Sequence, residues 1–180
     1  MCCDRCIEAV QDVLSSFHLQ VKKITLGEAN FTDNGTVSLA KLEEALKKRG
    51  FGLLSSEEER IVEKVRTTVI DMVHHSPAAR GKKISISQEL EEKIRKPYRY
   101  IQRVFSERQG ISIEKYVIAQ RIEKVKQIIG ETNSNFSEIA VLLGYRSLAH
   151  LSSQFKKISG MSMLQFRKTH CTDRKAIDKL

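Results

Sequence analysis

The spacing of hydrophobic residues divides the chain into a mixed first third and a helical remainder. In the first third, a helical spacing runs from Asp4 to Phe17, a short β-branched stretch follows, and a second helical spacing lies between Ser38 and Gly50. The run at residues 51–54 has the composition of a last short strand. The predicted order of elements in this zone is therefore α-β-β-α-β.

The remainder of the chain shows a helical period throughout. Ser56 and Glu59 have the spacing of a capping box, which predicts a helix from Ser56 to His75. His74 and His75 at its end suit the partial negative charge of a helix C-terminus. A loop with turn-forming and basic residues is predicted next. Further helices are predicted at residues 86–95, 97–109, 112–130, 136–143, 147–159 and 162–170.

An internal repeat with an offset of 50 residues runs through this helical part. It aligns hydrophobic residues with hydrophobic residues, glycine with glycine and serine with serine. The pairs are Ile101 and Leu151, Phe105 and Phe155, Gly110 and Gly160, Ser112 and Ser162, and Tyr116 and Phe166. Each copy predicts a helix, a tight break, a second helix and a glycine stop. We expect two helix-turn-helix units joined by a helix of about 19 residues, roughly 28 Å long.

The second helix of the first unit, at residues 97–109, carries side chains that suit the edges of bases. Its predicted buried face consists of Tyr100, Ile101, Val104 and Phe105. The residues predicted to point outward are Arg99, Gln102, Arg103 and Ser106. The second helix of a helix-turn-helix lies in the major groove of DNA, where arginine pairs with guanine and glutamine with adenine.

The second helix of the second unit, at residues 147–159, is chemically plainer. Its predicted core residues are Leu148, Leu151 and Phe155. The outward residues are Arg146, Ser147, Ala149, His150, Ser153, Gln154 and Lys157. This unit is expected mainly to hold backbone phosphates, with His150 and Gln154 as candidate base readers. The helix between the units can hold the two second helices about one DNA turn apart, roughly 34 Å.

Charge is distributed unevenly along the chain. Residues 1–55 hold seven Lys or Arg and seven Asp or Glu, whereas the following residues hold 24 and 15, so the whole net charge of +9 lies there. This asymmetry favours a polyanionic partner on the helical side. A basic, well-solvated surface is the plainer interpretation of the same charge.

A family resemblance rests on residues between about Ile84 and Lys168. They are Tyr100-Ile101-Gln102-Arg103-Val104-Phe105, Gly110-Ile111-Ser112, Tyr116, Arg121-Ile122, Glu138-Ile139-Ala140, Gly144-Tyr145, Phe155-Lys156-Lys157, Gly160 and Phe166-Arg167. This stretch resembles the DNA-binding domain of the AraC/XylS family of bacterial transcription regulators. Arg95 stands where the first turn of that family usually has glycine.

The resemblance implies sequence-specific binding of double-stranded DNA through two helix-turn-helix units and control of transcription. It places Arg99, Gln102 and Arg103 at base-reading positions. It makes RNA polymerase a plausible partner, and it leaves a homodimer open.

Three of the four cysteines lie at the start of the chain, as Cys2, Cys3 and Cys6. Thiolates at this short spacing suit soft metals. Met1-x-Cys3-x-x-Cys6, followed by an amphipathic helix, resembles the start of a heavy-metal-associated domain, whose fold is ferredoxin-like. Only two residues precede Cys3, so the first strand of that fold is missing. The resemblance implies a soft metal such as Cu(I) or Zn at Cys3 and Cys6, with Cys2 as a third ligand.

Two other interpretations of the cysteines stay open. The first domain could be a decayed one that is kept for dimerisation or packing, or Cys3 and Cys6 could form a redox-active disulfide. In either case the expected fold class is α+β: a small degenerate ferredoxin-like domain at residues 1–55, a connecting helix and loop at 56–79, and an all-α double helix-turn-helix domain at 80–180.

Several function classes are disfavoured. No apolar run reaches the 18 or so residues of a membrane span, and no apolar stretch of a signal peptide follows the start, so we expect a cytoplasmic protein. No phosphate-binding glycine loop or nucleophile–base pair stands out, so we do not expect an enzyme. The leading hypothesis is a DNA-binding transcription regulator that responds to metal or redox state. The alternative is a metal-trafficking or thiol-redox protein whose basic half docks an acidic protein.

Overall fold

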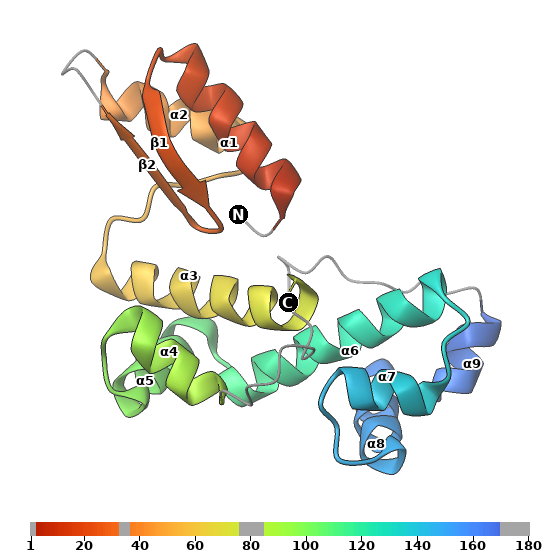
Figure 1. The fold of residues 1–180 in the computed structure, drawn as a ribbon. Helices are drawn as coiled ribbons and strands as arrows, with labels where there is room; N and C mark the ends of the chain where they lie inside the picture. Colours follow the sequence, from red (N-terminus) through yellow and green to blue (C-terminus); the bar gives the residue numbers. More distant parts are fainter. Residues whose placement is uncertain (1–2, 33–36, 76–84, 170–180) are drawn as a thin grey trace. The chain divides into compact units, whose positions relative to one another are not determined.

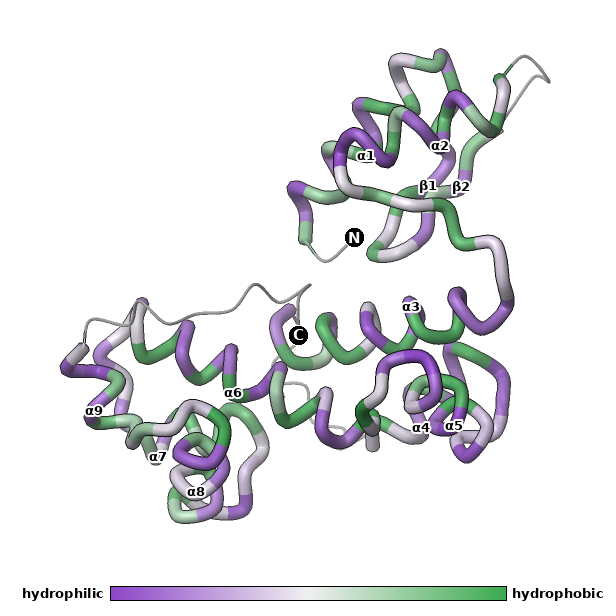
Figure 2. The backbone as a smooth tube through the Cα atoms, turned by 180° about the vertical axis from the view of Figure 1, so that it is seen from behind, coloured by the Kyte–Doolittle hydropathy of each residue, from purple (hydrophilic) through white to green (hydrophobic). Residues whose placement is uncertain are grey.

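The computed structural model describes residues 3–32, 37–75 and 85–169. They fall into two compact units, an N-terminal one that ends at Thr67 and a C-terminal one that begins at Thr68. Each unit is described by itself below. Hydrophobic and hydrophilic positions alternate along the helices of both units (Figure 2). Within the described residues, no helix is both long and apolar enough to cross a lipid bilayer.

The N-terminal unit begins with two helices packed on a β-hairpin (Figure 1), and it ends within α3 (Glu57–Ile70). Its elements are α1 (Asp4–Ser16), β1 (Gln20–Thr25), β2 (Glu28–Thr32) and α2 (Leu39–Lys48). The strands are antiparallel, with Val21 opposite Phe31 and Ile24 opposite Ala29. A core of Val10, Val13, Leu14, Leu19, Leu42 and Leu46 lies among these elements.

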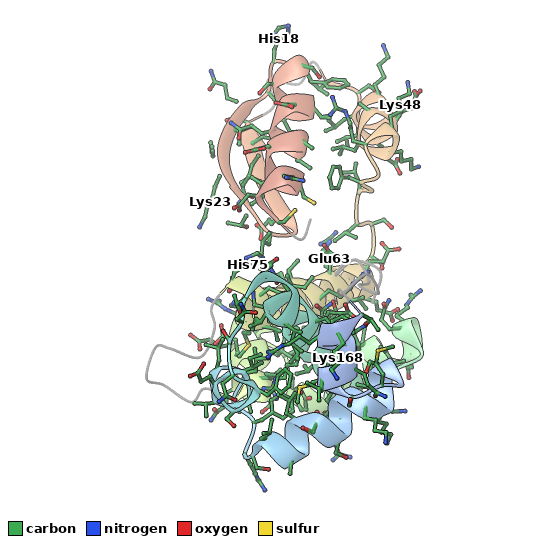
Figure 3. All side chains as sticks on the ribbon, turned by 90° about the vertical axis from the view of Figure 1, so that its right-hand side faces the viewer. His18, Lys23, Lys48, Glu63, His75 and Lys168 are labelled. Carbon is green, nitrogen blue, oxygen red and sulfur yellow. The ribbon has the colours of Figure 1, made fainter. Side chains whose placement is uncertain are left out.

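His18 marks the sharp exit from α1. Its φ of 56° lies in the left-handed region, and its side chain is exposed, as Figure 3 shows. The turn between the strands needs Gly27, whose φ is 82°. There an added Cβ would lie 3.0 Å from the methyl carbon of Thr67, so both backbone conformation and space favour glycine.

The predicted last strand at residues 51–54 is wrong. The sheet of the described residues has two strands, β1 and β2, and residues 51–54 have no regular structure. The Phe51 N–H donates to the Leu46 carbonyl at 2.9 Å, so the chain here finishes the end of α2 instead of pairing with a strand. Leu53 and Leu54 are exposed. The α-β-β-α part of the predicted order is confirmed, whereas the ferredoxin-like fold is not.

The helix predicted from Ser56 to His75 is confirmed. It consists of α3 (Glu57–Ile70) and one π-helical turn, η1 (Asp71–His75). The Glu59 N–H donates to the Ser56 hydroxyl at 3.1 Å, and the Ser56 N–H donates to the Glu59 carboxylate at 3.1 Å, which is the predicted capping box.

The C-terminal unit contains the six further helices that the sequence predicts. They are α4 (Ile86–Ile94), α5 (Tyr98–Gln109), α6 (Ile113–Glu131), α7 (Phe136–Leu142), α8 (Leu148–Ser159) and α9 (Met163–Lys168). Figure 1 shows α4 and α5 near one end of α6, and α7, α8 and α9 near the other. Helix α6 has the expected 19 residues.

The two halves of this unit repeat each other in detail. Gly110 ends α5 at a φ of 69°, and Gly160 ends α8 at 78°. In each half the serine two residues later caps the next helix with its side chain. The rings of Phe105 and Tyr116 lie 5.5 Å apart, and those of Phe155 and Phe166 lie 5.6 Å apart. All four rings are buried, so each half has its own aromatic core.

Candidate nucleic-acid interface

Helix α5 separates a buried hydrophobic face from an outward polar one. Ile101, Val104 and Phe105 are at most 3% exposed, so they anchor the helix in the core of the first half. Arg99 and Arg103 are exposed, and Gln102 and Ser106 are partly exposed. These four residues, with Tyr100, line a shallow hollow on the surface of the helix. The side chains that the sequence assigned to base edges therefore lie together on one open face.

Tyr100 belongs to this outward surface and not to the core, which corrects the prediction. It is partly exposed, whereas its neighbour Ile101 is fully buried. The Arg103 guanidinium lies 5.4 Å from the centre of the Tyr100 ring, and the Lys96 ammonium lies 5.8 Å from it. The face of an aromatic ring attracts cations, so Tyr100 gathers two basic groups at the start of α5.

The break before α5 is held by local backbone chemistry. Arg95 ends α4 with a φ of 57° and a ψ of 40°, in the left-handed region, and Pro97 precedes the first helical residue. The Tyr98 N–H then donates to the Glu91 carboxylate at 2.7 Å. This contact ties the start of α5 to the last turn of α4.

A carboxylate that the sequence analysis missed lies beside Gln102. The Tyr98 hydroxyl donates to Oε1 of Glu114 at 2.8 Å, and the Gln102 amide donates to the same oxygen at 3.1 Å. Partial burial raises the pKa of Glu114, but bonds from its own N–H, Tyr98, Ser112 and Gln102 outweigh this and lower it. Burial and the bond to Glu114 raise the pKa of Tyr98, so its hydroxyl keeps its proton.

Helix α8 presents the corresponding surface of the second half. Arg146, Ser147, Ala149, His150, Ser153 and Lys157 are exposed, and Gln154 is partly exposed. The Ser147 hydroxyl accepts from the His150 N–H at 3.2 Å, so it caps the helix. Ring nitrogen Nε2 of His150 lies 3.2 Å from the Gln154 amide nitrogen, so the two candidate readers contact each other.

One core prediction for α8 is wrong. Leu151 and Phe155 are fully buried as predicted, but Leu148 is 36% exposed. Leu148 lies on the same face of the helix as Leu151, but it is the first residue of α8 and is not covered as Leu151 is. Leu148 is therefore exposed at the start of α8.

His74 makes a side-chain contact with α6 in addition to ending a helix, which is all that the sequence predicts for it. Its Nε2 lies 2.8 Å from the side-chain oxygen Oε1 of Gln120, and the side-chain NH₂ group of Gln120 donates to the Tyr116 hydroxyl at 2.9 Å. Burial lowers the pKa of His74, the bond with Gln120 raises it, and Lys124 lowers it, for a net decrease. The His74 imidazole thus joins η1 to the middle of α6 and, through Gln120, to the aromatic core of the first half.

The described cysteines meet at the start of α1. Cys3 is the N-cap, Cys6 lies in the first turn, and their sulfur atoms are 3.6 Å apart. Both side chains are partly exposed. The described residues hold no group of three or more His, Cys, Asp or Glu side chains arranged for a metal. Cys2, the predicted third ligand, lies outside the described residues.

The C-terminal helices match a known domain family. Residues 92–169, less than half of the chain, match the family model described as a helix-turn-helix domain. The chain is 32% identical over 69 residues to the melibiose operon regulatory protein of Escherichia coli strain K12. This match covers 38% of this chain and 23% of that protein. The chain is also 31% identical over 64 residues to the probable transcriptional regulator LumQ of Photobacterium leiognathi. This match covers 36% of this chain and 26% of that protein.

Two solved structures are similar to part of this chain. One is the C-terminal domain of the two-component response regulator yesN from Fusobacterium nucleatum, with a TM-score of 0.49 and 23% identity, covering 58% of this chain and 95% of that one. The other is the C-terminal domain of AraT, a response regulator from Geobacillus stearothermophilus, with a TM-score of 0.49 and 25% identity, covering 64% and 87%. This chain spans about a quarter of the length of the curated relatives that it matches. Residues 92–169 thus match a helix-turn-helix domain model, and part of the chain is similar to a regulatory protein and to a probable transcriptional regulator.

Proposed function

We propose that this protein is a sequence-specific DNA-binding transcription regulator, with α5 and α8 in successive segments of the major groove. The observation that carries the proposal is the outward face of α5. There Arg99, Gln102 and Arg103 surround a shallow hollow while the opposite face is anchored in the core. Similarity to the helix-turn-helix domain of transcription regulators supports the same function. The net charge of +9 supports a polyanionic ligand.

In this proposal, α5 and α8 make different kinds of contact with DNA. Helix α5 offers Arg99, Gln102 and Arg103, whose side chains can make bidentate contacts with bases. The exposed residues of α8 include Ala149 and Ser153, which carry little base information, and its exposed cations are Lys156 and Lys157, with Arg146 just before the helix. Lysine and arginine contacts to phosphates position a protein on DNA but carry no sequence information directly. Helix α8 therefore sets the register, and α5 supplies most of the base preference.

Alanine substitutions in α5 test this assignment. Gln102→Ala and Arg103→Ala are expected to weaken binding to a selected DNA site by about 1–3 kcal/mol each, because a bidentate base contact is lost. The matched control is Gln109→Ala, since Gln109 is exposed at the far end of the same helix. Equal affinities of the wild type and the two variants, measured by fluorescence anisotropy, would remove α5 as the reading helix.

We further propose that Cys3 and Cys6 make the regulator responsive to a soft metal ion. Two thiols 3.6 Å apart at the start of one helix can ligate the same ion, and thiolates prefer Cu(I) and Zn²⁺ among biological metals. The Cys3→Ser/Cys6→Ser double variant is expected to bind DNA like the reduced wild type and to ignore added metal. An unchanged metal response in this variant would rule these thiols out. Homodimer formation and contact with RNA polymerase stay predictions of the family resemblance.

A further inference from the structure

Glu114 is the acidic side chain that meets the outward face of α5. It lies in the first turn of α6, and its Oε1 accepts hydrogen bonds from Tyr98 at 2.8 Å and Gln102 at 3.1 Å. Tyr98 and Gln102 are four residues apart, so they lie on the same side of α5, one turn from each other. A single carboxylate oxygen on α6 therefore fixes two side chains of the helix that is proposed to read DNA.

The chemistry of this contact determines which way the Gln102 amide points. A carboxylate only accepts hydrogen bonds, so the NH₂ group of Gln102 and not its carbonyl oxygen must face Glu114. One N–H and the carbonyl oxygen of the amide stay available on the other side. That pair of groups is the one that adenine requires, since its N7 accepts and its N6 amino group donates.

The second half of the repeat shows that this contact is not needed for the fold. The positions 50 residues after Tyr98, Gln102 and Glu114 are Leu148, Ser152 and Leu164. Leu148 is 36% exposed and Leu164 is 55% exposed, so neither replaces the polar contact with a buried one. The second half nevertheless forms the same helices and a similar aromatic contact. The Tyr98–Glu114–Gln102 cluster is therefore a special feature of the first half.

We propose that Glu114 is a positioning residue that sets base specificity: it orients the Gln102 amide so that α5 prefers adenine at one position of its DNA site. This inference rests on the proposed function. Holding the amide in its binding orientation before DNA arrives reduces the cost of ordering a long side chain, and it disfavours the flipped amide that would suit other bases.

Two substitutions separate this role from a simple effect of charge. Glu114→Gln removes the negative charge but keeps an acceptor oxygen at the same distance. Glu114→Met removes the charge and the acceptor oxygen while keeping a chain of similar length. Both variants lose the repulsion between Glu114 and DNA phosphates, so both should bind non-specific DNA more tightly by the same factor. Any difference in base preference between the two variants therefore results from the hydrogen bond that residue 114 accepts from Gln102.

The measurement is selection and sequencing of random DNA with the full-length reduced protein. For Glu114→Met, we expect the preference for adenine at the base pair that Gln102→Ala identifies to fall about fivefold, with other positions unchanged. Glu114→Gln should keep the preference of the wild type. In a Gln102→Ala background, the two Glu114 variants should give the same motif. Circular dichroism melting is expected to show both variants folded, as the second half predicts.

Each contrary result has a distinct meaning. Equal base preferences in Glu114→Gln and Glu114→Met would overturn the positioning role. A loss spread over every position of the motif, or one that persists in the Gln102→Ala background, would also overturn it, because Glu114 would then act on the fold or on DNA directly. If the wild type itself enriches no sequence, the proposed function fails, and this inference fails with it.

Discussion

Arg95 ends α4 in a backbone conformation that elsewhere in the C-terminal unit is taken by glycine. Gly110, Gly144 and Gly160 follow α5, α7 and α8 with φ values of 69°, 71° and 78°, and Arg95 has a φ of 57°. A side chain in the left-handed region meets the backbone, which costs roughly 1–2 kcal/mol, and glycine avoids that cost. The first turn of the repeat therefore carries a local strain that the second turn lacks.

Replacing this residue should stabilise the protein. Arg95→Gly is expected to raise the free energy of unfolding by about 1 kcal/mol, and Gly110→Ala is expected to lower it by about the same amount. A Cβ at Gly110 would meet no atom within 4 Å, so that variant isolates the backbone effect. Urea denaturation measures both changes, and a destabilised Arg95→Gly protein would contradict the strain.

His74 gives the stability a dependence on pH. Its pKa lies below the ordinary value because of burial, with Gln120 acting against the shift and Lys124 and His75 adding to it. The unfolded chain therefore gains a proton at a higher pH than the folded chain does, so stability is lost as the pH falls below about 6.5. The fall in Tm between pH values of about 7.5 and 5 should be smaller in His74→Gln than in the wild type. Equal falls in both proteins would show that His74 does not contribute.

Single outward residues were largely predictable, whereas contacts between helices were not. The 3.6-residue period was enough to place Arg99 and Arg103 on the surface, where the structure has them. Tyr100 sits at the border of the hydrophobic face, where periodicity does not decide. Glu114 escaped notice because its partner Gln102 is 12 residues away on another helix. No local pattern reports such a contact.

At the scale of elements, a capping serine begins the helix that follows each glycine stop of the repeat. Ser112 accepts from the Lys115 N–H at 3.3 Å, and Ser162 accepts from the Gln165 N–H at 3.2 Å. The Gln165 side chain also accepts from the Ser162 N–H at 2.9 Å, which completes a capping box in the second half. These contacts satisfy amide groups that a helix start leaves without partners. Each helix after a glycine stop is thus restarted by a serine.

Removal of either cap should destabilise the protein. Ser112→Ala and Ser162→Ala are each expected to lower the free energy of unfolding by about 1 kcal/mol. The matched control is Ser153→Ala, an exposed serine inside α8, where alanine is expected to change stability by less than about 0.5 kcal/mol. Losses of equal size at all three serines would mean that capping is not what these residues provide.

The helices were predictable as elements because each carries its own signals of start and stop. The capping box at Ser56 and the glycine stops at Gly110 and Gly160 are local chemistry, and the structure has all three. The strand predicted at residues 51–54 failed for the opposite reason. A strand depends on a neighbour with matching hydrogen-bonding groups, and a hydrophobic run does not reveal whether one exists.

At the scale of the whole molecule, charge and repetition point to the same partner. The excess of positive charge lies outside residues 1–55, and the C-terminal unit presents two similar helix pairs at the ends of α6 (Figure 1). The 19 residues of α6 predict that the second helices of the two units lie about one DNA turn apart, which suits a ligand that itself repeats at that distance. An acidic protein surface would also attract the positive charge, but binding to it would not require the outward face of α5 that carries Gln102 and Arg103.

The most direct test of this account is selection of random double-stranded DNA by the reduced full-length protein, followed by sequencing at moderate salt. We predict a motif of two segments about one helical turn apart, with stronger base preference in the segment that α5 contacts. Loss of that segment's preference in Arg103→Ala would assign it to α5. Recovery of no motif would contradict the account and would favour docking of the basic unit on an acidic protein.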